Sequence, residues 1–151
     1  MFEASSHRRP VNPKVEQYLK TEIWSSLNEK LCELRGRLND EEIFPQQWFV
    51  FGSFATNKAR LVSDLDIGVV IKDKDQNSRF DKLEIFGEST SYGYAGKHRI
   101  ELTNYDDLNL IRLIQDIKLL DWDEKEKVFK LGQTLPRITY QELVDNQAKA
   151  G

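Results

Sequence analysis

The sequence predicts a single domain in which helices and strands are combined. Its 151 residues are about the length of one domain. A hydrophobic share of 39% is enough for a core, and 31% charged residues indicate a soluble surface. A long amphipathic segment comes first and short apolar segments of strand composition follow. We therefore expect one packed domain over residues 13–151, preceded by a flexible, polar N-terminal arm at residues 1–12.

The first expected element is a long amphipathic helix over residues 14–38. Apolar residues recur there at spacings of three and four, at Val15, Leu19, Ile23, Leu27, Leu31, Leu34 and Leu38. Asn12 and Pro13 suit an N-cap followed by the first helical position. Cys32 lies beside this stripe, and we expect it to be a half-buried thiol without chemistry.

The middle of the chain is expected to alternate between strands and short helices. Three segments have the aromatic and β-branched composition of strands, at residues 48–51, 65–71 and 99–105. Short helices are expected at residues 54–60 and around 80–86, with a charged loop at 72–78 and a glycine-containing loop at 88–97.

The last third is expected to be helical. Asp106 is the expected cap of a helix that carries Leu110, Leu113, Ile114 and Ile117. Another helix is expected to follow Asp123. Thr139 and Glu142 have the spacing of a capping box, which predicts a short terminal helix.

Composition and charge exclude several classes of protein. With 22 basic and 25 acidic residues, the net charge of −3 is too balanced to attract nucleic acid by overall electrostatics. The longest apolar runs have four or five residues, far short of the roughly 20 that span a bilayer. The first twenty residues lack the apolar core of a signal peptide. A lone cysteine excludes an internal disulfide, so a cytoplasmic location is expected.

The most informative segment contains a glycine turn and two carboxylates. Gly52 and Ser53 end the first expected strand, and Asp64 and Asp66 follow after ten intervening residues. Side chains alternate along a strand, so the two acids share one open face about 6.5–7 Å apart. Carboxylates this close repel one another unless a cation lies between them, and Mg²⁺ prefers such oxygen ligands.

Glu101 is the expected third acid of this site. It alternates with Ile100 and Leu102, so a neighbouring strand would place it beside the aspartates. Three carboxylates can bind two metal ions about 3.5–4 Å apart, which suits in-line phosphoryl displacement and hence nucleotidyl transfer. Gly52 would let the backbone approach a phosphate, and the start of the following helix would supply N–H donors. The alternative is that Glu101 forms a surface ion pair with Arg99.

These residues resemble the G-S-x10-D-x-D signature of the minimal nucleotidyltransferases, which are part of the DNA polymerase β-like superfamily. The resemblance implies an α+β nucleotidyltransferase fold, with a small mixed β-sheet backed by α-helices. It implies that Gly52 and Ser53 hold the triphosphate of ATP, that Asp64 and Asp66 ligate Mg²⁺, and that Glu101 is the third acid of a site for two ions. Residues 76–97 contain no residue that matches the family.

The length of the chain, together with the resemblance, also implies a partner protein. Stand-alone members of this length resemble the antitoxin half of HEPN/minimal-nucleotidyltransferase pairs. In those pairs AMP is transferred from ATP to a tyrosine of a HEPN ribonuclease toxin. The alternatives are an aminoglycoside or RNA 3′-end acceptor, or an antitoxin that acts by binding without catalysis.

Several other residues have two interpretations. Lys58 is expected to bind the triphosphate from the short helix, together with Arg60, although both charges could simply be solvated. Tyr92 and Tyr94 could stack on a base or pack at an edge. His98 is expected to be structural.

Overall fold

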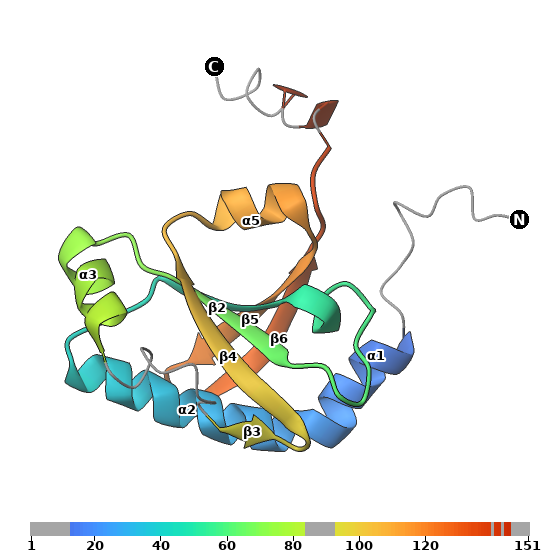
Figure 1. Ribbon diagram of the computed structural model, residues 1–151, viewed down its shortest axis with the longest axis horizontal. Helices are drawn as coiled ribbons and strands as arrows, with labels where there is room; N and C mark the ends of the chain where they lie inside the picture. The colour runs from blue at the N-terminus through green and yellow to red at the C-terminus, as the bar shows by residue number, and fades with distance from the viewer. Residues whose placement is uncertain (1–12, 84–92, 140, 143, 146–151) are drawn as a thin grey trace, which may run out of the picture.

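The computed structural model describes residues 13–83, 93–139, 141, 142, 144 and 145. Its strands are β1 (Gln47–Phe51), β2 (Leu65–Val70), β3 (Tyr94–Ala95), β4 (His98–Tyr105), β5 (Ile117–Asp123) and β6 (Val128–Leu135). They form one curled sheet in the order β3-β4-β2-β1-β5-β6 (Figure 1). β2 and β4 run parallel, whereas the other neighbouring pairs are antiparallel. The α+β class and the mixed sheet are confirmed, as are the three predicted strands.

A continuous helical segment from residue 13 to residue 40 crosses one face of the sheet (Figure 1). It consists of α1 (Pro13–Tyr18), a π-helical turn (Leu19–Ile23) and α2 (Trp24–Asp40). The predicted helix is therefore confirmed, while the π turn is not evident from the apolar spacing. Its buried stripe packs against alternate residues of β2, namely Leu65, Ile67 and Val69. Among the described residues, no helix is both long enough and apolar enough to cross a bilayer.

The opposite face of the sheet is only partly covered. A second buried cluster there joins Phe49 and Val70 to Ile111, which lies on α5 (Leu108–Ile114), and to Ile117. Gly68 lies on the same face, and a Cβ atom on it would come within 2.3 Å of the Phe49 ring. Because Asp66 has the same parity as Gly68 and Val70, the predicted carboxylate face is the face that α5 covers at one end.

Two segments expected to be loops contain regular structure. Helix α3 (Lys74–Lys82) begins within the predicted loop at residues 72–78. Asp73 caps it, because its Oδ1 accepts a hydrogen bond of 2.9 Å from the Gln76 N–H. The sequence also predicts a helix around residues 80–86. Its part beyond residue 83 lies outside the described residues. In the predicted loop at residues 88–97, Tyr94 and Ala95 pair with β4 as β3.

The prediction for the C-terminal third was largely wrong. Ile117 begins β5 instead of extending α5, and the N-cap of α5 is Asp107, not Asp106. The helix expected after Asp123 is instead a turn into β6, because the Asp123 carboxylate accepts hydrogen bonds from the N–H groups of Lys125 and Glu126. These bonds close the turn locally and leave β5 and β6 to pair.

The predicted cap at Thr139 is present. Its Oγ1 accepts a hydrogen bond of 3.1 Å from the Glu142 N–H at the start of a short helical segment.

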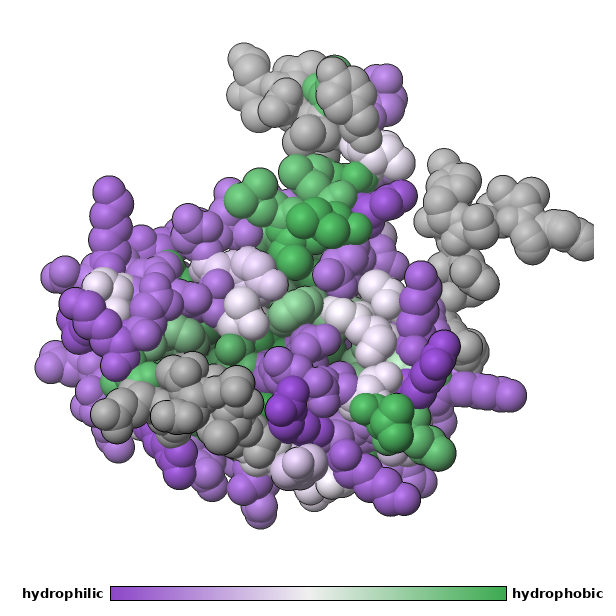
Figure 2. Space-filling view, in the orientation of Figure 1, coloured by the Kyte–Doolittle hydropathy of each residue, from purple (hydrophilic) through white to green (hydrophobic). Residues whose placement is uncertain are grey.

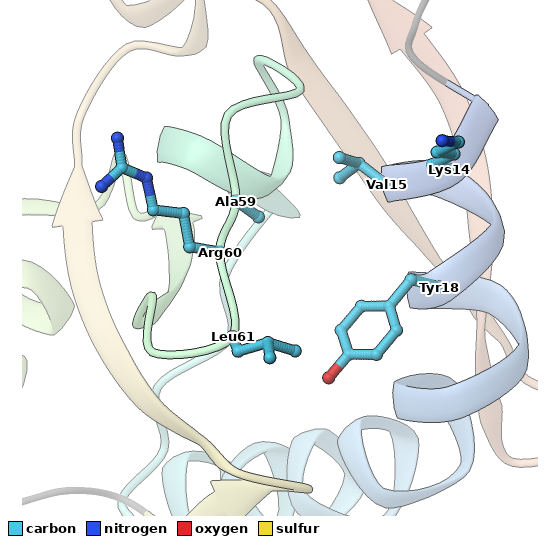
Figure 3. Close-up of a pocket in the computed structure, with 6 residues that line it drawn as sticks. All are labelled: Lys14, Val15, Tyr18, Ala59, Arg60 and Leu61. Carbon is cyan, nitrogen blue, oxygen red and sulfur yellow. The ribbon is translucent and has the colours of Figure 1, made fainter.

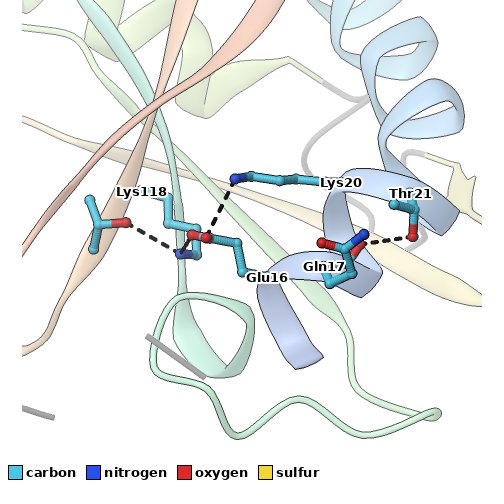
Figure 4. Close-up of polar contacts among 6 residues, drawn as sticks. Glu16, Gln17, Lys20, Thr21 and Lys118 are labelled. Atoms are coloured by element: carbon cyan, nitrogen blue, oxygen red, sulfur yellow. Dashed lines mark hydrogen bonds and ion pairs between the residues drawn. The ribbon is translucent and has the colours of Figure 1, made fainter. Parts of the chain in front are cut away.

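A buried ion pair fastens α1 to β5 (Figure 4). The side chain of Lys118 is 1% exposed, and its Nζ donates to Glu16 Oε1 at 3.1 Å and to Thr134 Oγ1 at 3.3 Å. The hydrogen bond from Lys118 holds the pKa of Glu16 below its ordinary value, although burial opposes the shift. A buried ammonium group without a counterion is costly, so this contact stabilises the start of the helix against the sheet.

Glu16→Gln should lower the free energy of unfolding by about 2 kcal/mol at pH 7, because it leaves the Lys118 ammonium without its charged partner. The pKa of Glu16 is lower in the folded state than in the unfolded state, so its contribution is fully present above about pH 4.5 and is lost at lower pH. Urea unfolding from pH 7 to pH 3 measures the difference. Glu29→Gln, on an exposed part of α2, is the control. A difference from wild type that is independent of pH would contradict the ion-pair interpretation.

Candidate active site

The glycine turn follows β1 directly. Gly52, Ser53 and Phe54 form a single 3-10 turn, with Gly52 at a left-handed φ of 72°. The Gly52 carbonyl accepts hydrogen bonds from the N–H groups of Ala55 and Thr56, each 3.0 Å long. The helix predicted at residues 54–60 is not formed, because Asn57 also has a left-handed φ, of 67°, which a helix does not tolerate.

The turn packs directly on one of the predicted carboxylates. A Cβ atom on Gly52 would lie 2.1 Å from Asp66 Oδ2, so only glycine fits here. The register of β1 and β2 causes this contact, because it pairs Phe51 with Asp66. The glycine was expected for a different reason, which was close approach of the backbone to a phosphate. The structure gives close approach to Asp66.

Gln115 is a site residue that the sequence analysis missed. It follows α5, and its Oε1 accepts a hydrogen bond of 2.7 Å from the Gly52 N–H. This backbone donor is therefore already engaged, which leaves the Ser53 hydroxyl and the neighbouring N–H groups as donors for a phosphate. No local sequence signal marks Gln115, because it reaches the turn from 63 residues away.

The three predicted acids are brought together by the parallel pairing of β2 with β4. Asp66 and Glu101 are direct register partners in that pairing. Asp64 lies just before β2, two residues from Asp66. Glu101 therefore lies beside Asp66, as its alternation with Ile100 and Leu102 predicted.

Arg99 bridges two of these acids. One of its guanidinium nitrogens, Nη2, lies 3.2 Å from Asp64 Oδ2 and 3.3 Å from Glu101 Oε2. The alternative ion pair between Arg99 and Glu101 is therefore present, and Asp64 shares it. A cation already lies between these carboxylates, as their mutual repulsion requires.

The pKa shifts of the acids follow from their proximity. A hydrogen bond between the Asp64 and Glu101 carboxyl groups lowers the pKa of Asp64 and raises that of Glu101. Burial, with a smaller contribution from the Asp64 charge, raises the pKa of Asp66. Glu101 and Asp66 are thus the groups that gain most from a further cation, because extra positive charge favours their ionised forms.

The donor set fits a hard divalent cation, although the side chains are not arranged around an ion. Within the described ranges, no three His, Cys, Asp or Glu side chains are placed so that they could together hold one metal. Arg99 lies between Asp64 and Glu101, and Asp66 is turned against Gly52. Three carboxylates from adjacent strands would nevertheless provide the oxygen ligands that a hard divalent cation prefers, if Arg99 were displaced.

Lys58 lies beside the glycine turn, where its N–H donates a hydrogen bond of 2.9 Å to the Ser53 carbonyl oxygen. It is exposed on an irregular segment and lines a hollow of about 800 Å³ together with Gln115 and Arg137. Since Gln115 is bonded to Gly52, this hollow begins at the turn. Arg60, which was expected on the same helix as Lys58, is likewise on an irregular segment.

The two tyrosines and His98 are the remaining candidates from the sequence. Tyr94 is 54% exposed on β3, and Tyr92 lies outside the described residues. His98 is fully buried at the start of β4, which fits the structural interpretation.

Residues 37–144 match the family model described as "Polymerase beta, Nucleotidyltransferase". Because this match covers well over half of the chain, the protein belongs to the polymerase beta nucleotidyltransferase family. Gly52, Ser53, Asp64, Asp66 and Glu101 all lie inside the matched range. No curated protein and no solved structure gives a match. The general function is therefore nucleotidyl transfer, and the predicted nucleotidyltransferase fold is confirmed.

Gly52→Ala should weaken the binding of Mg²⁺·ATP and also lower stability by about 1–2 kcal/mol. The new Cβ meets the Asp66 carboxylate, and alanine is strained at a left-handed φ. Gly36→Ala is the matched control, since nothing lies within 4 Å of its Cβ position and a helix interior favours alanine. Calorimetric titration and urea unfolding measure the two effects. An affinity equal to that of wild type would show that the turn is only structural.

Proposed function

We propose that this protein is a Mg²⁺-dependent adenylyltransferase of the minimal nucleotidyltransferase type. In this proposal it transfers AMP from ATP to a tyrosine of a HEPN-type ribonuclease toxin and thereby acts as the antitoxin. The observation that supports it is the grouping of Asp64, Asp66 and Glu101 beside the Gly52 turn, in a chain of the polymerase beta nucleotidyltransferase family.

Each part of the site has a role in this reaction. Asp64, Asp66 and Glu101 would hold two Mg²⁺ ions, which supply charge stabilisation for the attacking and leaving oxygens. Ser53 and Lys58 would bind the triphosphate beside Gly52. The tyrosine oxygen would form a bond to the α-phosphorus as the bond to pyrophosphate breaks, and the hydroxyl proton would pass to one of the carboxylates.

The surface around the carboxylates favours a protein acceptor. Leu61 and Val62, which are 68% and 87% exposed, come shortly before Asp64. Leu110 and Ile114, which are 56% and 67% exposed, lie on α5. Figure 2 shows apolar surface over α5 and a separate apolar area at the lower right, with hydrophilic surface between them. Exposed apolar groups of this kind mark protein interfaces, whereas RNA binding calls for a strongly basic surface.

The test is incubation of the protein with ATP, Mg²⁺ and a purified co-encoded HEPN ribonuclease, followed by intact-mass spectrometry. We expect the ribonuclease to gain adenylate mass on a tyrosine. Asp64→Asn/Asp66→Asn should lower the transfer rate on the order of a hundredfold or more, because loss of metal ligands exceeds the effect of outer-shell changes. Asp73→Asn/Asp75→Asn, an exposed pair of the same spacing at the start of α3, is the matched control, since asparagine also caps a helix.

The other outcomes identify the alternatives. Transfer to an RNA 3′ end or an aminoglycoside, with an unmodified HEPN protein, would contradict the proposed acceptor. Full neutralisation of the toxin by Asp64→Asn/Asp66→Asn would indicate an antitoxin that acts by binding alone.

Leu61→Ser/Val62→Ser should reduce labelling of the ribonuclease about tenfold, because an apolar contact of the acceptor is lost. The affinity for ATP should stay at the wild-type value, since both side chains are largely exposed and neither is part of the proposed nucleotide site. Phe44→Ser is the control, because Phe44 is 52% exposed and precedes the end of β1 that is remote from Gly52. Unchanged labelling would exclude this surface as the docking site.

A further inference from the structure

His98 is a fully buried polar residue. It lies between the glycine turn and the segment that leads into Asp64. It is the first residue of β4, and both of its ring nitrogens are hydrogen-bonded. Nδ1 lies 2.7 Å from the Ser63 carbonyl oxygen, and Nε2 lies 2.9 Å from the Tyr18 hydroxyl. Because a carbonyl oxygen can only accept, Nδ1 donates, and in the neutral ring Nε2 accepts from Tyr18.

The His98 ring also contacts the glycine turn, through Phe54. Phe54 meets the His98 ring edge to face, with ring centroids 5.0 Å apart, and Tyr18 meets it similarly at 5.6 Å. Phe54 follows Ser53 directly, and Ser63 directly precedes Asp64. His98 therefore touches the last residue of the glycine turn and the residue before the first carboxylate.

In the segment between these two points, Ala55 is buried and Ala59 packs against the main core, whereas residues 60–62 are exposed. Leu61 and Val62 are largely exposed, and a pocket of about 240 Å³ separates Ala59, Arg60 and Leu61 from α1 (Figure 3). In that view Leu61 and Tyr18 point towards the same pocket, whereas Arg60 points away from it. The hydrogen bonds between Arg60 and Ser63 are internal to the segment. The bond from His98 to Ser63 thus ties this segment to β4.

We infer that His98, held by Tyr18, is a positioning residue that places Asp64 relative to the glycine turn and to Glu101. The His98 ring holds the Ser63 carbonyl, and Ser63 directly precedes Asp64. His98 and Glu101 are both on β4, so this bond positions Asp64 relative to Glu101. The inference rests on the assignment of Gly52, Ser53 and Asp64 to the nucleotide site made above. His98 itself touches no substrate in this account.

Two variants test the inference. Tyr18→Phe removes one hydrogen bond and keeps the ring, and His98→Leu removes both bonds. We expect Mg²⁺·ATP to bind a few-fold more weakly to Tyr18→Phe, which loses one hydrogen bond, and about tenfold more weakly to His98→Leu, which is the lower end of the effect found for residues that orient metal ligands. His98→Asn, which can retain one hydrogen bond, should recover part of the affinity. Hydrogen exchange of the amides in residues 55–64 should accelerate in Tyr18→Phe and His98→Leu.

Phe129→Leu is the control, because Phe129 is equally buried but lies on β6, far from β4 in the sheet order. It should lower stability without a change in nucleotide affinity or in exchange at residues 55–64. If Tyr18→Phe and His98→Leu behave like Phe129→Leu in both measurements, the inference is wrong. If the wild-type protein binds no Mg²⁺·ATP, the proposed function fails, and the exchange measurement still decides whether His98 holds this segment.

Discussion

The parallel pairing of β2 with β4 is the constraint on which the candidate site depends. It sets Asp66 directly beside Glu101, and it places Arg99 where its guanidinium reaches both Glu101 and Asp64. Three carboxylates gathered in this way repel one another, and positive charge among them or a proton shared between two of them relieves the repulsion. In the structure that charge is Arg99. A divalent cation would satisfy the same requirement with more charge, and this competition links the electrostatics of the site to its proposed chemistry.

A second constraint is steric and joins the glycine turn to the carboxylates. Gly52 touches Asp66 so closely that any side chain would displace the carboxylate, and Gln115 holds the N–H of the same glycine. The glycine turn and the Asp66 carboxylate are therefore one packed unit. His98 contacts both Phe54 and Ser63, and so holds the two ends of the segment between them. The spacing of the signature reflects these contacts as well as the length of the intervening chain.

Local patterns predicted much of the fold and the proximity of the three acids. The apolar spacing of the first helix, the composition of β1, β2 and β4, and the parity of Glu101 are all properties of short segments. The β5–β6 hairpin was missed because residues 123–127 are charged helix formers, whereas cross-strand packing of Trp122 on Phe129 selects strands. Gln115 and Tyr18 were missed because their roles arise only from tertiary contacts.

The central claim is that Asp64, Asp66 and Glu101 form a divalent-metal site in the nucleotide complex. The most direct measurement is the anomalous scattering of Mn²⁺ in crystals grown with a non-hydrolysable ATP analogue. We expect Mn²⁺ among the three carboxylates, with Arg99 moved away from Asp64 and Glu101 and the triphosphate beside Gly52 and Ser53. Mn²⁺ bound elsewhere, with Arg99 still bridging Asp64 and Glu101, would contradict this claim.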